Sequence, residues 1–148
     1  AYLNIIGMET LGLRMERVCN NAFRLAQALE KLEGVSVNYP LLESSPYHEL
    51  AEKQLSGKGG AILTIRAGSK ERAYKLINHL KYVKIATNIG DVRTLVIHPA
   101  STIYIHSTPE AMEEAGVYDD TIRISVGIED IKDLIQDFTE AVESLGEE

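Results

Sequence analysis

The sequence is short of cysteine, of positive charge and of long apolar runs. A single cysteine, Cys19, cannot form an internal disulfide, so we expect a protein of a reducing, cytoplasmic compartment. No stretch is long and apolar enough to span a membrane, and we expect no signal peptide. The 15 Lys and Arg against 22 Asp and Glu give a formal net charge of −7. This charge argues against a nucleic-acid partner, because binding phosphates needs clustered positive charge.

The overall length and composition of the chain are typical of one soluble domain. The chain has 148 residues, of which 45% are hydrophobic and 25% charged. Its first fifteen residues are apolar nearly all round, and a helix of this kind is normally buried on most sides. The chain starts at Ala1 without an initiator methionine. We therefore expect that it was cut from a longer chain or that this segment docks onto a partner.

Periodicity and capping signals predict the secondary structure. We expect a long first helix that runs from near the start to about Leu32 and is closed by Gly34, and a last helix with an apolar stripe. The order of elements predicts a single α+β domain over residues 1–148. Its sheet is largely antiparallel, and its helices pack on one face. Further strands are expected at residues 35–39, 61–67, 84–89, 93–98 and 121–127, and further helices at 47–55, 70–80 and from 108 to 116.

The last predicted strand contains the most informative side chain, Arg123. Apolar and polar residues alternate strictly here, which places Ile122 and Ile124 on the covered face and Arg123 on the other. The apolar set continues through Val126 and Ile128, and the polar set through Ser125, Gly127 and Glu129. A guanidinium on a rigid strand is suited to binding a carboxylate or phosphate through two hydrogen bonds. The alternative is an ordinary surface arginine paired with an acidic neighbour.

Other polar motifs are weaker candidates for a site. The histidines match no zinc-ligand spacing, so we expect no metal; they are His48, His79, His98 and His106. His98 precedes a proline, and we expect it to be structural rather than a general acid or base. The glycine-rich run 57–60 is followed by a strand and not by a helix N-terminus, which favours a turn over a phosphate site.

Several segments together resemble one enzyme family. They are GMETLGLRMERVCNNAFRLAQALE at 7–30, NIGDVRTLVIHPASTIY at 88–104 and TIRISVGIEDIKDLI at 121–135. They occur in the same order in the C-terminal domain of the Cys/Met-metabolism enzymes that depend on pyridoxal phosphate, and are most similar to O-acetylhomoserine sulfhydrylases. The resemblance covers essentially the whole chain.

The resemblance implies roles for two residues. Arg123 matches the arginine that binds the α-carboxylate of the amino-acid substrate, and Asn88 matches a serine or asparagine beside that carboxylate. The alternative for Asn88 is a turn-forming residue before Gly90. Several relatives have threonine and histidine where this chain has Ile103 and Tyr104, which affects the expected substrate preference. The family places its cofactor lysine in an N-terminal domain that this chain lacks, so we expect no catalytic residue and no covalent cofactor here.

The resemblance therefore predicts the substrate-binding C-terminal domain of a trans-sulfuration enzyme of homocysteine and methionine biosynthesis, inactive alone. The expected partners are a substrate such as O-acetylhomoserine, the missing cofactor domain and further copies in a homo-oligomer. Methionine γ-lyase and cystathionine γ-synthase or lyase activities stay open for the complete enzyme. A stand-alone, non-catalytic domain that binds a small carboxylate or a protein is the alternative of a different class.

Overall fold

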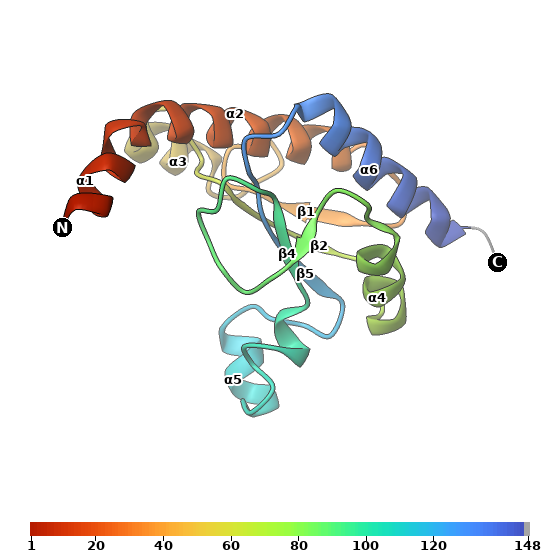
Figure 1. The fold of residues 1–148 in the computed structure, drawn as a ribbon. Helices are drawn as coiled ribbons and strands as arrows, with labels where there is room; N and C mark the ends of the chain where they lie inside the picture. Colours follow the sequence, from red (N-terminus) through yellow and green to blue (C-terminus); the bar gives the residue numbers. More distant parts are fainter. Residues whose placement is uncertain (147–148) are drawn as a thin grey trace.

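A sheet lies at the centre of the protein (Figure 1). It has five strands in the order β1-β2-β5-β4-β3. The computed structural model describes residues 1–146. Every pairing is antiparallel except that of β3 with β4. The strands are β1 (Ser36–Asn38), β2 (Ile62–Arg66), β3 (Lys84–Ile85), β4 (Leu95–Ile97) and β5 (Thr121–Ser125). The helices are α1 (Tyr2–Glu9), α2 (Leu11–Leu29), α3 (His48–Leu55), α4 (Lys70–His79), α5 (Pro109–Glu114) and α6 (Ile131–Glu143), with 3₁₀ turns at Pro99–Ser101 and Ser144–Gly146.

The core lies between one face of the sheet and the long helices. Ile122 and Ile124 of β5 are fully buried, and their partners Ile65 and Leu63 on β2 project to the same face. They belong to a core cluster that includes Leu25 and Leu29 of α2, Leu76 of α4, and Leu134 and Phe138 of α6. Helices α2 and α6 pack against each other and α4 packs against α6. The structure thus confirms the α+β fold, with the first and last long helices on the same side of the sheet.

The first helix differs from the prediction, because it is broken at Thr10 into α1 and α2 and ends at Leu29. The Arg14 side chain turns back at the break. Its Nη2 donates to the Gly7 carbonyl at 2.5 Å, and its Nε donates to Thr10 Oγ1 at 3.4 Å. The Gly7 carbonyl would accept from the chain four residues on in a continuous helix, so the guanidinium takes over that role and stabilises the interruption. Among residues 1–146, no helix is long and apolar enough to cross a membrane.

Candidate functional site

The face of the sheet opposite the helices carries Arg123. This residue occupies the middle of β5, opposite Thr64 on β2 and Ile97 on β4. Directly opposed residues project to the same face, so the three side chains form one row across the sheet. Arg123 is half-buried, whereas Ile97 is almost fully buried. This face is therefore partly covered by protein around β4 and β5.

Part of the cover is the segment 86–94, which joins β3 to β4. Because β3 and β4 are parallel, this connection has to return along the sheet before β4 begins. On the way, Gly90 N donates to Ser125 Oγ at 3.3 Å, and the Val92 carbonyl accepts from Ile128 N at 2.9 Å. Ser125 is consequently 1% exposed although the alternation places it on the polar face. These two bonds fix the segment 86–94 against β5, the strand that carries Arg123, and against the residues that follow it.

Backbone carbonyls hold the Arg123 guanidinium. Its Nη2 donates to the Thr87 carbonyl at 2.8 Å and to the Asn88 carbonyl at 3.4 Å. Its Nε is buried and has no hydrogen-bond partner among the described residues. Burial lowers the pKa of Arg123, but an arginine stays charged at neutral pH. The observed partners are carbonyl oxygens, so the interpretation as a surface arginine paired with an acidic neighbour does not describe its hydrogen bonds.

Asn88, the second residue that the resemblance implies for the site, lies beside Arg123. The observed contact runs through the Asn88 backbone carbonyl, and the residue itself is exposed. Gly90, two residues on, has a φ of +82°, a left-handed conformation that suits glycine. The segment therefore contains the turn that the alternative interpretation of Asn88 expects. Thr87 was missed by sequence reasoning, since a backbone carbonyl has no signature in residue type.

His98 follows β4, and its ring lies against Tyr74 of α4, with both ring nitrogens hydrogen-bonded. It is 4% exposed, Nε2 lies 2.6 Å from the Asp119 carbonyl, and Nδ1 lies 2.8 Å from Ser101 Oγ. Because a carbonyl only accepts, Nε2 carries the proton and Nδ1 is the acceptor for Ser101. This is the structural, backbone-bonded histidine that the sequence favours. Ile103 lies half-exposed in the following loop.

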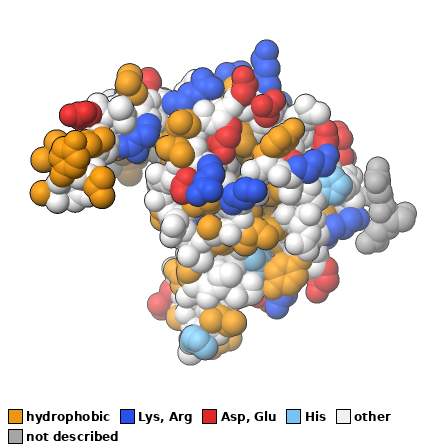
Figure 2. Space-filling view, in the orientation of Figure 1, with side chains coloured by type: hydrophobic (Ala, Val, Ile, Leu, Met, Phe, Trp, Pro, Cys, Tyr) orange, Lys and Arg blue, Asp and Glu red, His pale blue; other side chains and the backbone are white. Residues whose placement is uncertain are grey.

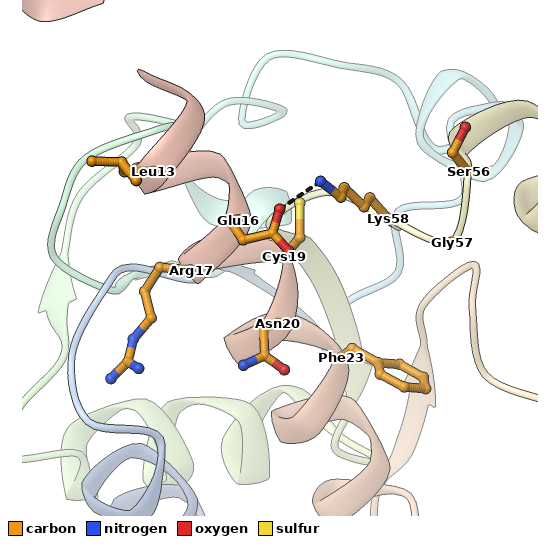
Figure 3. A pocket seen from close by; sticks show the side chains of 9 residues that line it. All are labelled: Leu13, Glu16, Arg17, Cys19, Asn20, Phe23, Ser56, Gly57 and Lys58. Atoms are coloured by element: carbon orange, nitrogen blue, oxygen red, sulfur yellow. Dashed lines mark hydrogen bonds and ion pairs between the residues drawn. The ribbon is translucent and has the colours of Figure 1, made fainter. Parts of the chain in front are cut away.

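The lysines are all at the surface. All eight are exposed, and two are held in close ion pairs: Lys58 with Glu16 at 2.5 Å and Lys81 with Glu140 at 2.6 Å. Figure 3 shows Lys58 directed at Glu16 across a pocket of about 440 Å³ between α2 and the turn after α3. The hydrogen bond to its carboxylate partner raises the pKa of each lysine. Among residues 1–146, no group of three or more His, Cys, Asp or Glu side chains is placed to hold a metal ion.

Comparison with known proteins decides the family. The family model described as Cys/Met metabolism PLP-dependent enzyme matches residues 1–143. The chain belongs to this family of pyridoxal-phosphate enzymes. It is 47% identical over 144 residues to homocysteine synthase of Schizosaccharomyces pombe, a match that covers 96% of this chain and 34% of that protein. It is 40% identical over 146 residues to L-methionine gamma-lyase of Fusobacterium nucleatum subsp. polymorphum, covering 98% and 37%.

A solved structure of the same family confirms the fold. The O-acetylhomoserine sulfhydrylase of Wolinella succinogenes superimposes with a TM-score of 0.80 at 35% identity, over 95% of this chain and 37% of that one. A Campylobacter jejuni structure described as an O-acetylhomoserine (thiol)-lyase, which carries a pyridoxyl-lysine, gives a TM-score of 0.89 at 36% identity, over 93% and 33%. The chain thus spans about a third of the length of the relatives it matches.

No lysine of this chain has the buried environment of a lysine that binds pyridoxal phosphate. A lysine that binds the cofactor must offer a neutral amine, which enzymes obtain by burying it or placing it beside other cations. Lys58 and Lys81 have the opposite environment, exposed and paired with carboxylates that raise their pKa. The glycine-rich turn beside Lys58 leads into β2, so it offers no helix N-terminus for a phosphate. No step involving the cofactor is therefore assigned to residues of this chain.

Proposed function

We propose that this chain is the C-terminal, substrate-binding part of a trans-sulfuration enzyme of the O-acetylhomoserine sulfhydrylase type. One observation carries the proposal: Arg123 is a half-buried cation whose observed hydrogen-bond acceptors are neutral carbonyls and not carboxylates. An incoming carboxylate would supply the opposite charge and accept from the guanidinium N–H groups that face the open side, with Nε itself enclosed by the protein.

The surroundings fix how Arg123 can act. The Thr87 and Asn88 carbonyls hold Nη2 and so restrict rotation of the guanidinium plane. A plane held in this way presents its remaining donors in one orientation, so a bound α-carboxylate also sets the direction of the bonds at the substrate Cα. Ordering the substrate before reaction lowers the entropic part of the barrier. The exposed Asn88 amide is proposed to donate a second hydrogen bond to the same carboxylate.

The proposed substrate is an activated homoserine such as O-acetylhomoserine, which the complete enzyme would convert to homocysteine. The match to a homocysteine synthase at 47% identity, above the 40% for a methionine gamma-lyase, supports the sulfhydrylase reaction. γ-Lyase and cystathionine-type activities share the same carboxylate contact and are the alternatives. We further propose that the complete enzyme is a cytoplasmic homo-oligomer and that its cofactor is bound by an N-terminal domain outside this chain. The chain alone is proposed to be inactive.

The decisive experiment changes Arg123 in the complete enzyme. Arg123→Lys should lower kcat/KM for O-acetylhomoserine by about 10- to 100-fold, mainly through KM, because a charge-assisted bond contributes about 1.5–3 kcal/mol and lysine loses the planar geometry. Arg93→Lys is the matched control, since Arg93 is exposed and bonds only its neighbour Asp91 among the described residues. An unchanged kcat/KM for Arg123→Lys would remove Arg123 from the site.

A second measurement tests the assignment of the cofactor to another part of the enzyme. The isolated chain mixed with pyridoxal phosphate should show no stable band near about 420 nm after dialysis, and no lysine fixed by borohydride. A stable yellow chain modified at one lysine would contradict the proposal.

A further inference from the structure

The carboxylate of Glu129, just beyond the end of β5, is bonded to the residue at which β4 begins. Both of its oxygens accept from Thr94: Oε1 from the backbone N–H at 2.5 Å and Oε2 from the side-chain hydroxyl at 2.8 Å. The Thr94 hydroxyl oxygen accepts in turn from Gly127 N at 3.0 Å. Thr94 is fully buried, so the loss of these bonds would leave buried polar groups without partners. These bonds, called the Thr94 clamp below, fix Thr94 to the chain that follows β5.

Helix α2 holds the backbone that carries Glu129. Asn21 is fully buried, and its Nδ2 donates to the carbonyls of Gly127 at 3.0 Å and of Glu129 at 2.9 Å. Arg17, one turn earlier, donates from Nη2 to the same Glu129 carbonyl at 3.2 Å, and Figure 3 shows it extending away from Lys58. Both side chains come from the middle of α2, away from the apolar side chains that Figure 2 shows gathered where α1 projects. The Thr94 clamp is therefore anchored to a long helix of the core.

The Thr94 clamp is connected to the Arg123 guanidinium through β3. The Thr94 carbonyl accepts from Lys84 N at 3.1 Å, a bond that helps to pair β3 with β4. β3 is an exposed edge strand of two residues, so its position depends on these few bonds. Just beyond β3 the chain reaches Thr87 and Asn88, whose carbonyls accept from Arg123 Nη2. A shift of Thr94 would therefore move the two carbonyls that orient the guanidinium.

We propose that Glu129 is a positioning residue for the substrate carboxylate, and that it acts through Thr94 on the segment that orients Arg123. This inference rests on the proposed function. The negative charge of Glu129 would repel a substrate carboxylate, so its contribution to binding comes through its neighbours. A guanidinium binds a carboxylate through two hydrogen bonds only when it is held close to the required position, and that accuracy depends on the groups that support it. Without the Thr94 clamp, substrate binding should weaken more than the chemical step.

Two substitutions at Thr94 in the complete enzyme separate this role from packing. Thr94→Val keeps the shape of the side chain and removes the hydroxyl, whereas Thr94→Ser keeps the hydroxyl and removes the buried methyl group. Thr94→Val should raise KM for O-acetylhomoserine by at least about fivefold and change kcat by less than about twofold. Thr94→Ser should leave KM within about twofold, although it lowers the melting temperature. Thr139→Val, at a half-buried position of α6, is the matched control and should leave KM unchanged.

A pair of inhibitors tests whether the effect is specific to the carboxylate. Homoserine and 3-aminopropan-1-ol, the same molecule without its carboxylate, are compared in the original enzyme and in Glu129→Gln, whose amide offers Thr94 one acceptor oxygen instead of two. The Ki of homoserine should rise by at least about fivefold, and that of the amine should change by less than about twofold. Equal changes for both inhibitors, or equal rises in KM for Thr94→Val and Thr94→Ser, would indicate a general loss of packing and overturn the proposal.

A double-mutant cycle with Arg123→Lys separates this inference from the proposed function. Because Glu129 and Thr94 are proposed to act through Arg123, Thr94→Val should raise KM by less than about twofold in the Arg123→Lys enzyme. Additive effects of the two substitutions, or a rise in KM for Arg123→Lys with none for Thr94→Val, would overturn the inference and leave the proposed function standing. An unchanged kcat/KM for Arg123→Lys alone would overturn both.

Discussion

Gly127→Ala tests whether the segment over the polar face is held as tightly as the structure shows. A Cβ at this position would lie 2.6 Å from the Arg93 carbonyl carbon, and closer still to the Val92 carbonyl oxygen and the Glu129 carboxylate. Ordinary contacts to carbon begin near about 3.5 Å, so backbone at Val92 and Arg93 has to move by roughly 1 Å. The glutamate end could turn aside, but the backbone cannot move without disturbing its hydrogen bonds.

The expected loss of unfolding free energy follows from the contacts that the added methyl group would disturb. Crowding of this kind costs about 1–3 kcal/mol. The shift also strains the bonds from Ile128 N to the Val92 carbonyl, 2.9 Å, and from Gly127 N to Thr94 Oγ1, 3.0 Å. Each such bond contributes about 1 kcal/mol, so with one of the two lost the free energy of unfolding should fall by roughly 2–4 kcal/mol in total.

Urea unfolding followed by circular dichroism measures this loss, with Gly12→Ala as control. Gly12 lies in α2 and a Cβ there meets no atom within 4 Å, so alanine should be neutral or stabilise by up to about 1 kcal/mol. The two substitutions add the same methyl group and should differ in sign. Equal free energies of unfolding for both variants would refute the tight packing of segment 86–94 against Gly127.

Two further residues give predictions about stability. Burial raises the pKa of the Tyr39 phenol, so above about pH 10 the unfolded chain loses a proton that the folded chain keeps, and stability falls as pH rises. Tyr39→Phe should lower the free energy of unfolding by about 1 kcal/mol at pH 7, because the bond to the Gly60 carbonyl is lost. Urea unfolding at several pH values should show a smaller loss of stability above about pH 10 for the variant than for the original protein. Parallel pH profiles of the two proteins would contradict this prediction. The buried Asp137 carboxylate accepts from the backbone N–H groups of Lys81 and Tyr82, so Asp137→Ala should lower the unfolding free energy by about 2–4 kcal/mol, and a loss below about 0.5 kcal/mol would contradict this.

Alternation along β5 predicted the covered face correctly where the strand persists. Ile122, Ile124 and Val126 are fully buried, but Ile128 is 38% exposed because the strand ends at Ser125. The burial of Ser125 on the opposite face was not predictable from periodicity. It depends on a segment from elsewhere in the chain lying over the sheet, which is tertiary information.

Two other differences between the predicted and the observed elements also involve contacts that local sequence patterns do not report. The strand predicted at 84–89 is reduced to Lys84–Ile85, since the chain leaves the sheet there to pass over Ser125. The break of the first helix at Thr10 is accompanied by the Arg14 side chain bonding Gly7. Gly7 and Gly12 flank the break and are poor helix formers, a signal that the prediction of one continuous helix did not use. The proposal for Arg123 comes from the alternation and the family resemblance, whereas its hydrogen bond to the Thr87 carbonyl was not predictable from either.

The hydrogen bonds of Arg123 stabilise the fold less than a pairing with a carboxylate would, and they suit the proposed role in binding. A partly buried guanidinium whose Nε lacks an acceptor loses hydration without full compensation, a cost on the order of 1–3 kcal/mol. Neighbouring carbonyls at Thr87 and Asn88 offset only part of it, because they satisfy Nη2 and carry no charge. Incomplete pairing of this kind is concentrated at functional or strained sites. An acidic neighbour would have stabilised the isolated domain better, but it would compete with a substrate carboxylate for the same donors. The absence of such a neighbour from the described hydrogen bonds of Arg123 is therefore what an anion-binding role requires.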